Sequence, residues 1–190
     1  MLIIKNKYFL IIESIKDINL KNIKIRNKFF IIYRNHKRNE HLNDLIKFRQ
    51  SCKLKDIKLY IANNFRLAFT LNADGVYLSS YNKSLKFLNY KKFNFGLIGS
   101  AHNFSEIIHK IKQGCNIILL SRLFLVNYDN NKSYLGVVKF NNFTKISKKL
   151  VPLGGIKIQN LNELKNVKSQ GFALLSEIKK KPTKIFSRLF

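Results

Sequence analysis

A chain of 190 residues is long enough to bury a core and short enough to form a single domain. Apolar residues make up 46% of it and aromatic residues 13%, which excludes an intrinsically disordered chain. No apolar run approaches the roughly 20 residues of a membrane-spanning helix, so we expect no membrane insertion.

The formal net charge of +26, from 36 Lys and Arg against 10 Asp and Glu, would suit a polyanionic partner. The basic residues are spread along the whole chain, however, and the sequence has no aromatic–basic RNA-binding motif and no Cys/His finger. We therefore expect no specific nucleic-acid partner and favour small phosphorylated ligands. Whether the charge is functional or reflects the codons of an AT-rich genome stays open.

Two cysteines, Cys52 and Cys115, lie far apart, and neither a Cys-x-x-Cys motif nor paired histidine spacing indicates zinc. This cysteine usage is typical of a reduced, cytoplasmic protein. At the N-terminus, Lys5, Asn6 and Lys7 interrupt an apolar stretch that has no small-residue cleavage site, so we interpret it as a strand and not a signal peptide.

Eight apolar, β-rich runs follow one another along the chain, at residues 7–13, 28–34, 57–62, 74–79, 94–100, 116–121, 150–155 and 172–176. Most are continuous and not alternating, which is typical of strands buried on both faces of a parallel sheet. Between the first two runs, the helical pattern over residues 15–27 is weak. Before the helix that follows Arg122 there is a long polar loop.

The clearest helical segments, residues 103–114 and 160–171, align with each other without a gap. Each begins with Asn as a candidate N-cap, has Glu three residues later, and ends in Gln-Gly, where Gly suits a left-handed C-cap. Each is followed by an apolar run that ends in Leu-Ser. The repeat indicates a recurring helix–strand unit.

Eight strands with helices between them predict a compact (β/α)₈ TIM barrel formed by a single domain, residues 1–180, with an open doubly wound sheet as the alternative. Residues 181–190 form a basic tail in which Pro182 ends any helix. The sequence does not predict the oligomeric state.

In such a barrel, the carboxyl ends of the strands form the working face. Ser79, Ser121 and Ser176 end the fourth, sixth and eighth predicted strands, where they either leave room for a ligand or simply begin turns. Gly154 and Gly155 follow the seventh strand and would let backbone N–H groups approach a phosphate closely.

Several polar side chains near strand ends could bind or act on an anionic ligand. A guanidinium after the second strand would grip phosphate with two parallel hydrogen bonds, and a lysine in the long loop after the sixth strand would suit a mobile lid. A hydroxyl and an imidazole end the fifth strand. These candidates are Arg34, Lys132, Ser100 and His102.

In order, the segments "YRN", "ANN", "ADGVYL", "IGSAHN", "QGCNIILLSRLF", "LGGI" and "GFALLSEI" resemble the thiamine phosphate synthase and thiazole tautomerase family, from about Tyr8 to Ile178. The resemblance implies a (β/α)₈ barrel. It also implies a role in thiamine biosynthesis, in which the synthases couple hydroxymethylpyrimidine pyrophosphate to thiazole phosphate and release pyrophosphate with the help of Mg²⁺.

The resemblance also implies roles for individual residues. Gly154, Gly155 and Ser176 match the thiazole-phosphate-binding positions. Arg34 matches the arginine of a Gln-x-Arg-x-Lys motif, in which Ile32 and His36 replace the glutamine and the lysine. A Ser-x-His motif and a lysine that reaches the pyrophosphate correspond to Ser100, His102 and Lys132.

The chain departs from the family at its metal site. Asn63 and Asn82 stand where the two magnesium-binding aspartates are expected, and an amide oxygen is a weaker Mg²⁺ ligand than a carboxylate. Mg²⁺ is therefore a doubtful cofactor. Arg122, which replaces part of a Gly-Pro-x-Phe motif, would supply positive charge in its place.

Two classes of function are consistent with these features. The first is a divergent thiamine phosphate synthase, in which Arg34, Ser100, His102, Arg122 and Lys132 act in catalysis. The second is a noncatalytic or regulatory barrel that binds a phosphorylated thiamine precursor, and a metal-free enzyme similar to the thiazole tautomerases is a further alternative.

Overall fold

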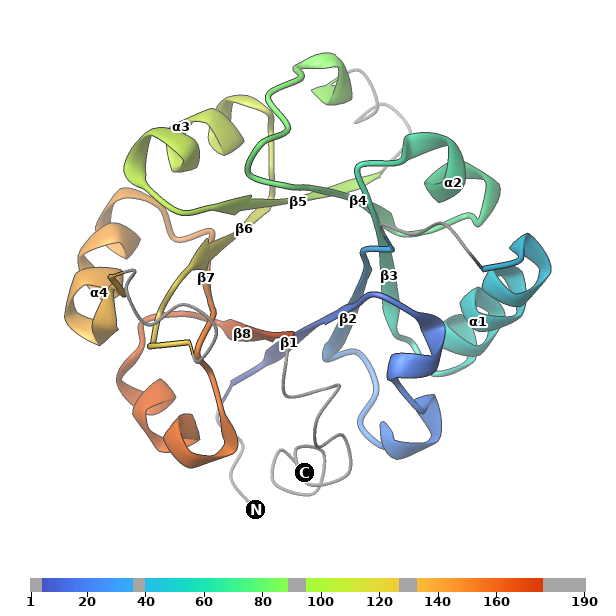
Figure 1. The fold of residues 1–190 in the computed structure, drawn as a ribbon, viewed down its shortest axis with the longest axis horizontal. Helices are drawn as coiled ribbons and strands as arrows, with labels where there is room; N and C mark the ends of the chain where they lie inside the picture. Colours follow the sequence, from blue (N-terminus) through green and yellow to red (C-terminus); the bar gives the residue numbers. More distant parts are fainter. Residues whose placement is uncertain (1–4, 36–39, 89–94, 127–132, 176–190) are drawn as a thin grey trace.

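The computed structural model describes residues 5–35, 40–88, 95–126 and 133–175. Eight strands, all parallel, form a closed barrel in which they follow sequence order around the ring (Figure 1). They are β1 (Lys7–Ile12), β2 (Phe29–Tyr33), β3 (Lys58–Ala62), β4 (Gly75–Leu78), β5 (Gly96–Ala101), β6 (Ile117–Ser121), β7 (Leu150–Leu153) and β8 (Gly171–Leu174). All eight predicted strands are confirmed.

The barrel closes where β1 pairs with β8, in a register that sets Lys7 opposite Gly171 and Leu10 opposite Leu174. This pairing confirms the predicted (β/α)₈ barrel and excludes the open doubly wound sheet, whose two edge strands would remain unpaired.

Helices and 3₁₀ turns surround the barrel (Figure 1). They are η1 (Ile15–Asp17), η2 (Leu20–Asn22), α1 (Leu42–Leu54), α2 (Phe65–Thr70), α3 (Phe104–Lys112), α4 (Gly136–Ile146) and η4 (Ile158–Asn166). Two short 3₁₀ turns replace a first helix, in agreement with the weak helical pattern over residues 15–27.

The strands bury side chains on both faces, which explains why their apolar runs are continuous. One set of side chains fills the barrel interior: Phe9, Ile11, Phe30, Ile32, Tyr60, Tyr77, Ile98, Leu119, Val151 and Ala173. In this interior the rings of Phe9 and Phe30 stack with their centroids 4.7 Å apart. The barrel is therefore a filled core, and ligand space is to be sought at its ends.

The predicted helix–strand repeat is correct in its first copy and wrong in its second. In α3, the Asn103 side chain accepts a hydrogen bond from Glu106 N at 2.9 Å, and Gly114 has a φ of +77°. In the second copy η4 is a 3₁₀ helix that begins at Ile158, and Asn160 lies inside it. Gly171 is no C-cap: it belongs to β8, where a Cβ atom would lie 2.2 Å from the Lys7 carbonyl oxygen.

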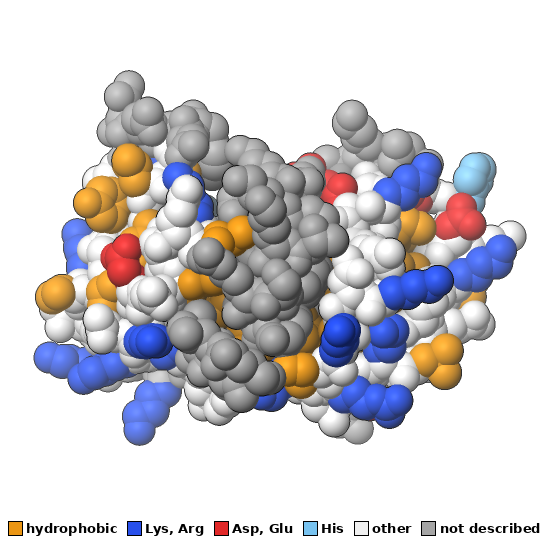
Figure 2. Space-filling model, turned by 90° about the horizontal axis from the view of Figure 1, so that it is seen from below, with side chains coloured by type: hydrophobic (Ala, Val, Ile, Leu, Met, Phe, Trp, Pro, Cys, Tyr) orange, Lys and Arg blue, Asp and Glu red, His pale blue; other side chains and the backbone are white. Residues whose placement is uncertain are grey.

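Lysine and arginine side chains are distributed over the face of the molecule seen in Figure 2 and do not gather in one patch. This matches the even spread of basic residues along the sequence. In the described ranges, no helix is both long and apolar enough to cross a membrane. The predicted basic tail at 181–190 lies outside the described residues.

Candidate functional site

The carboxyl ends of the eight strands lie together at one end of the barrel because all the strands are parallel. We call this end, with the residues that directly follow each strand, the mouth of the barrel. The predicted site residues that the structure describes lie at this mouth or in the turns that follow it, Asn82 being four residues beyond the end of β4.

Arg34 directly follows β2, in phase with the inward-facing Ile32. Its Nη2 atom lies 3.6 Å from Oε1 of Glu13, which follows β1. Its Nε atom is buried, and no described residue accepts a hydrogen bond from it. Arg34 thus has a donor at the mouth that a ligand oxygen could satisfy only after a neighbouring group moves aside.

Tyr77, from β4, links Arg34 to the next predicted residue. Its buried hydroxyl lies near the side chains of Ser100 and Arg34. Burial raises the pKa of Tyr77 above its ordinary value, although Ser100 and the Arg34 charge act in the opposite direction. At neutral pH the mouth therefore presents a guanidinium and two hydroxyls side by side.

Sequence reasoning identified Arg34 and Ser100 but missed Tyr77, because this residue lies inside an apolar run. The signal that could have found it is strand alternation. Tyr77 lies two residues before Ser79, so the two share one face of β4 and its extension.

The turn at Gly154 and Gly155 lies beside the segment that follows β6. Both glycines have positive φ, +90° and +70°. A Cβ atom on Gly154 would lie 3.1 Å from Ser121 Oγ and 3.3 Å from Cα of Arg122. The structure thus brings Ser121, Arg122 and the predicted phosphate turn together.

In this turn the carbonyl oxygens accept hydrogen bonds from described residues, whereas two N–H groups donate to none of them. The carbonyl oxygen of Gly154 accepts from Phe124 N at 3.1 Å, and that of Gly155 accepts from the Asn160 side chain at 2.8 Å. No hydrogen bond among the described residues uses the N–H of Gly155 or Ile156. Successive N–H groups in such a turn form a concave site suited to an anion.

Asn63 and Asn82, which the resemblance predicts to replace two aspartates, are joined by a hydrogen bond in which Nδ2 of Asn82 donates to Oδ1 of Asn63 at 3.0 Å. Oδ1 of Asn63 also accepts from Ser79 N at 3.2 Å, and Oδ1 of Asn82 accepts from Ser84 N at 3.1 Å. These two backbone donors fix the orientation of both amides.

This arrangement does not fit Mg²⁺. The cation requires several oxygen ligands, usually with carboxylates among them. Here both amide oxygens are already engaged by N–H donors, and within the described residues no group of three His, Cys, Asp or Glu side chains could hold a metal ion.

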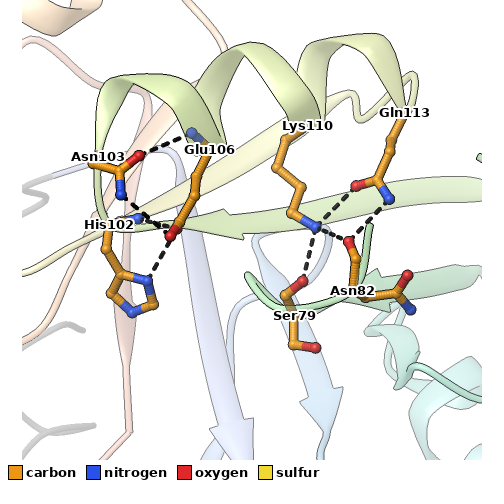
Figure 3. Close-up of polar contacts among 7 residues, drawn as sticks. All are labelled: Ser79, Asn82, His102, Asn103, Glu106, Lys110 and Gln113. Atoms are coloured by element: carbon orange, nitrogen blue, oxygen red, sulfur yellow. Dashed lines mark hydrogen bonds and ion pairs between the residues drawn. The ribbon is translucent and has the colours of Figure 1, made fainter. Parts of the chain in front are cut away.

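His102 follows β5, and its imidazole pairs with a carboxylate of α3 (Figure 3). Its Nδ1 lies 3.1 Å from Oε2 of Glu106, which also accepts from His102 N at 2.8 Å. The imidazole is 54% exposed. The described contacts tie His102 to the start of α3 and do not join it to Ser100.

A pocket of about 290 Å³ opens beside the mouth, between the ends of β2 and β3 and the first turns of α1 and α2. Among its polar lining residues is Glu40, which accepts hydrogen bonds from Tyr33, Asn35, Ser14 and Ile15 N. Burial raises the pKa of Glu40, but these hydrogen bonds outweigh it and hold the pKa below its ordinary value. Arg34, Asn63 and Tyr81 line the same pocket.

Three predicted site residues lie outside the described residues. They are His36, Lys132 and Ser176. Their assignments remain predictions.

Comparison with known proteins gives a consistent result. Residues 3–178 match the model of a family described as thiamine monophosphate synthase. A thiamine-phosphate synthase from Prochlorococcus marinus (strain AS9601) is 28% identical over 171 residues, which cover 88% of this chain and 48% of that protein. One from Clostridioides difficile (strain 630) is 26% identical over 144 residues, which cover 74% and 68%. The chain spans about half the length of the P. marinus relatives that it matches.

Solved structures show the same fold. A thiamine phosphate pyrophosphorylase from Pyrococcus furiosus superposes with a TM-score of 0.76 at 18% identity, over 98% of this chain and 94% of that one. A 3-keto-L-gulonate-6-phosphate decarboxylase from Vibrio cholerae gives a TM-score of 0.64 at 10% identity, over 98% and 99%. At these identities the likeness concerns the fold alone.

Proposed function

This chain belongs to the thiamine monophosphate synthase family, and we propose that it couples hydroxymethylpyrimidine pyrophosphate to thiazole phosphate and releases pyrophosphate, a step of thiamine biosynthesis. The observation that carries this proposal is that one mouth holds two separate sets of donors for anions. Arg34, Tyr77 and Ser100 form one set, and the Gly154–Gly155 turn beside Arg122 forms the other.

Each set suits one of the two substrates. The pyrophosphate leaves with the electron pair of its C–O bond, so negative charge grows on its oxygens, and Arg34 and Arg122 would offset that charge. Tyr77 stays protonated at neutral pH because burial raises its pKa, so its hydroxyl can donate. The N–H groups of Gly155 and Ile156, which no hydrogen bond among the described residues uses, would hold the thiazole phosphate and orient its ring.

We propose that Asn63 and Asn82 hold no divalent cation during this reaction. Oδ1 of Asn63 already accepts from Ser79 N and from Nδ2 of Asn82, and Oδ1 of Asn82 already accepts from Ser84 N. The positive charge that Mg²⁺ supplies elsewhere in the family would come from arginine side chains at this mouth.

The same amide pair favours a second function, a barrel that binds a phosphorylated thiamine precursor without coupling it. Binding requires only the donor sets, whereas the transfer step also requires charge stabilisation at its transition state. A metal-free tautomerase is a variant of this alternative, in which the exposed His102–Glu106 pair would move the proton.

The experiment is a coupling assay with both precursors, in excess EDTA and in Mg²⁺, combined with calorimetric titration of thiazole phosphate. We expect thiamine phosphate to form in both buffers. Product formation only in the presence of Mg²⁺ would support the synthase activity and contradict the proposal that the site works without a metal. Saturable binding without any product would indicate the noncatalytic barrel, and the absence of both would reject the whole assignment.

A further inference from the structure

Lys110, on α3, is fully buried, with 0% of its surface exposed, which is rare for lysine. Its Nζ donates to Ser79 O at 2.7 Å, Asn82 O at 2.7 Å and Gln113 Oε1 at 2.8 Å (Figure 3). The described ion pairs do not include it.

The three contacts define the protonation state of this nitrogen. Two of its acceptors are backbone carbonyls, which cannot donate. The third is the carbonyl of the Gln113 amide, whose Nε2 faces Asn82 O at 3.0 Å and Ser84 O at 2.8 Å and so fixes its orientation. Three acceptors need three N–H donors, which only the ammonium form provides. Burial lowers the pKa of Lys110, while Cys115 and Glu106 act in the opposite direction.

Lys110 and Gln113 together hold the segment that follows β4. We call residues 79–84 the β4 loop. Its carbonyl oxygens at Ser79, Asn82 and Ser84 are all bound from α3. Side chains of α3 and its C-cap, which follow the next strand along the chain, thus fix the shape of this loop.

The β4 loop in turn forms one wall of the mouth. Ser79 Oγ accepts from Asn63 Nδ2 at 2.7 Å, and the Tyr81 hydroxyl accepts from the same atom at 3.0 Å. Tyr81 and Asn63 line the 290 Å³ pocket together with Arg34. A path of hydrogen bonds therefore runs from the buried ammonium through the loop to the anion-binding side of the mouth.

We infer that Lys110 is a positioning residue for the pyrophosphate side of the mouth: its fixed ammonium holds the β4 loop, and with it the Asn63–Asn82 amide pair, without a divalent metal. This inference rests on the proposed function. The charge also acts directly, because a cation in a low-dielectric wall raises the potential of the mouth above it.

The test compares Lys110→Met with Lys112→Met, which removes the same charge two residues later from an exposed position on α3. Inorganic pyrophosphate is titrated calorimetrically in excess EDTA, and the affinity is calculated for folded protein only. We expect Lys110→Met to weaken binding at least about ten-fold, since a hydrogen bond to a charged group contributes on that scale. We expect Lys112→Met to stay within about two-fold of the wild type.

Hydrogen exchange followed by mass spectrometry gives a readout that needs no ligand. In Lys110→Met, we expect faster exchange in the β4 loop, where Ser79 N and Ser84 N donate to the amide pair, with little change in the remaining barrel. If this variant does not fold, Gln113→Met frees the Ser84 carbonyl and leaves the Asn82 carbonyl bound by Lys110 alone, and it should show a smaller change in the same direction.

The outcomes separate the two proposals. Folded Lys110→Met with unchanged pyrophosphate affinity, or with unchanged exchange in the β4 loop, overturns the inference. Equal losses in Lys110→Met and Lys112→Met also overturn it, since they would reflect net charge alone. If the wild type binds no pyrophosphate, the proposed function fails, and exchange in the β4 loop alone decides the role of Lys110.

Discussion

Arg34 has a buried hydrogen-bond donor that no described residue uses. Among the described side chains, its Nε is the buried polar atom that lacks a hydrogen-bond partner, and leaving such a donor unsatisfied costs about 1–3 kcal/mol. A ligand oxygen that reaches Nε, once the atoms that cover it move aside, would recover this free energy on binding.

Replacing Arg34 should reduce turnover more than any exposed arginine does. We expect Arg34→Ala to lower kcat/KM for thiamine phosphate formation by roughly 10²–10³-fold, the usual effect of removing a donor aimed at developing charge. Arg34→Lys should recover only part of this loss because an ammonium lacks the planar fork. The control is Arg26→Ala, whose side chain is 72% exposed. Full turnover in Arg34→Ala would remove Arg34 from the mechanism.

Gly155 and Gly136 form a matched pair for measuring what the phosphate turn requires. Both have positive φ, +70° and +68°, but a Cβ atom on Gly155 would lie 2.3 Å from Phe124 O, whereas one on Gly136 would have no neighbour within 4 Å. We expect Gly136→Ala to cost about 1–2 kcal/mol of unfolding free energy in urea, from backbone strain alone.

For Gly155→Ala, we expect a loss of at least about 3 kcal/mol, because backbone atoms must also move apart. Equal losses at the two glycines would mean that the turn has room for a side chain. A Gly155 variant is thus a test of packing first, and ligand affinity should be compared only between variants shown to be folded.

At the scale of elements, strands were predictable and their long-range contacts were not. Each strand is buried on both faces, so its continuous apolar run identifies it locally. Residues 103–114 and 160–171 share one local pattern, yet only the first forms the expected capped helix. Gly171 is instead required by the approach of Lys7, some 160 positions earlier in the chain. No local pattern contains that information.

Among the site residues too, some could be identified from local sequence and others depend on contacts made only in the folded chain. Arg34, Ser100 and the Gly154–Gly155 turn could be predicted because polar residues and glycines at strand ends are unusual in so apolar a context. Lys110 could not be predicted as a site residue, since a lysine on a helix normally faces solvent. Its burial depends on the carbonyl groups of the β4 loop, which only the folded chain brings to it.

The loops after β3 and β4 should form a metal site when Asn63 and Asn82 are both replaced by aspartate. We expect Asn63→Asp with Asn82→Asp to bind Mn²⁺, seen as a decrease in the electron paramagnetic resonance signal of the free ion, because carboxylates suit this cation. The wild type and an exposed Asn116→Asp variant should leave the signal unchanged. Strong Mn²⁺ binding by the wild type would contradict our interpretation of the amide pair.

At the scale of the whole molecule, the lysines and the buried acids change stability in opposite directions as pH rises. Lysines lose their charge near pH 10.5, which relieves the repulsion within a chain of net charge +26. For Lys5 and Lys110, burial lowers the pKa, so the unfolded chain holds more protons just below pH 10.5 and their contribution to stability rises with pH.

Two buried acids have the opposite effect. Burial raises the pKa of the Cys52 thiol from 9.0 to about 12 and that of the Tyr60 hydroxyl from 10.0 to about 12. Between the unfolded and folded values the unfolded chain has released these protons, whereas the folded protein still holds them. The stability that these groups confer is therefore complete below pH 9 and is lost as pH rises toward 12.

Comparison with Cys52→Ala isolates the thiol from the lysines, which titrate alike in both proteins. The substitution lowers stability at pH 7 by leaving a cavity, so the informative quantity is the change of the difference with pH. We expect the unfolding free energy of the wild type, relative to the variant, to fall by about 2 kcal/mol between pH 8 and pH 10.5 in urea titrations. A constant difference over this range would mean that Cys52 ionises in the folded barrel, which would require water to reach the layer between α1 and the strands.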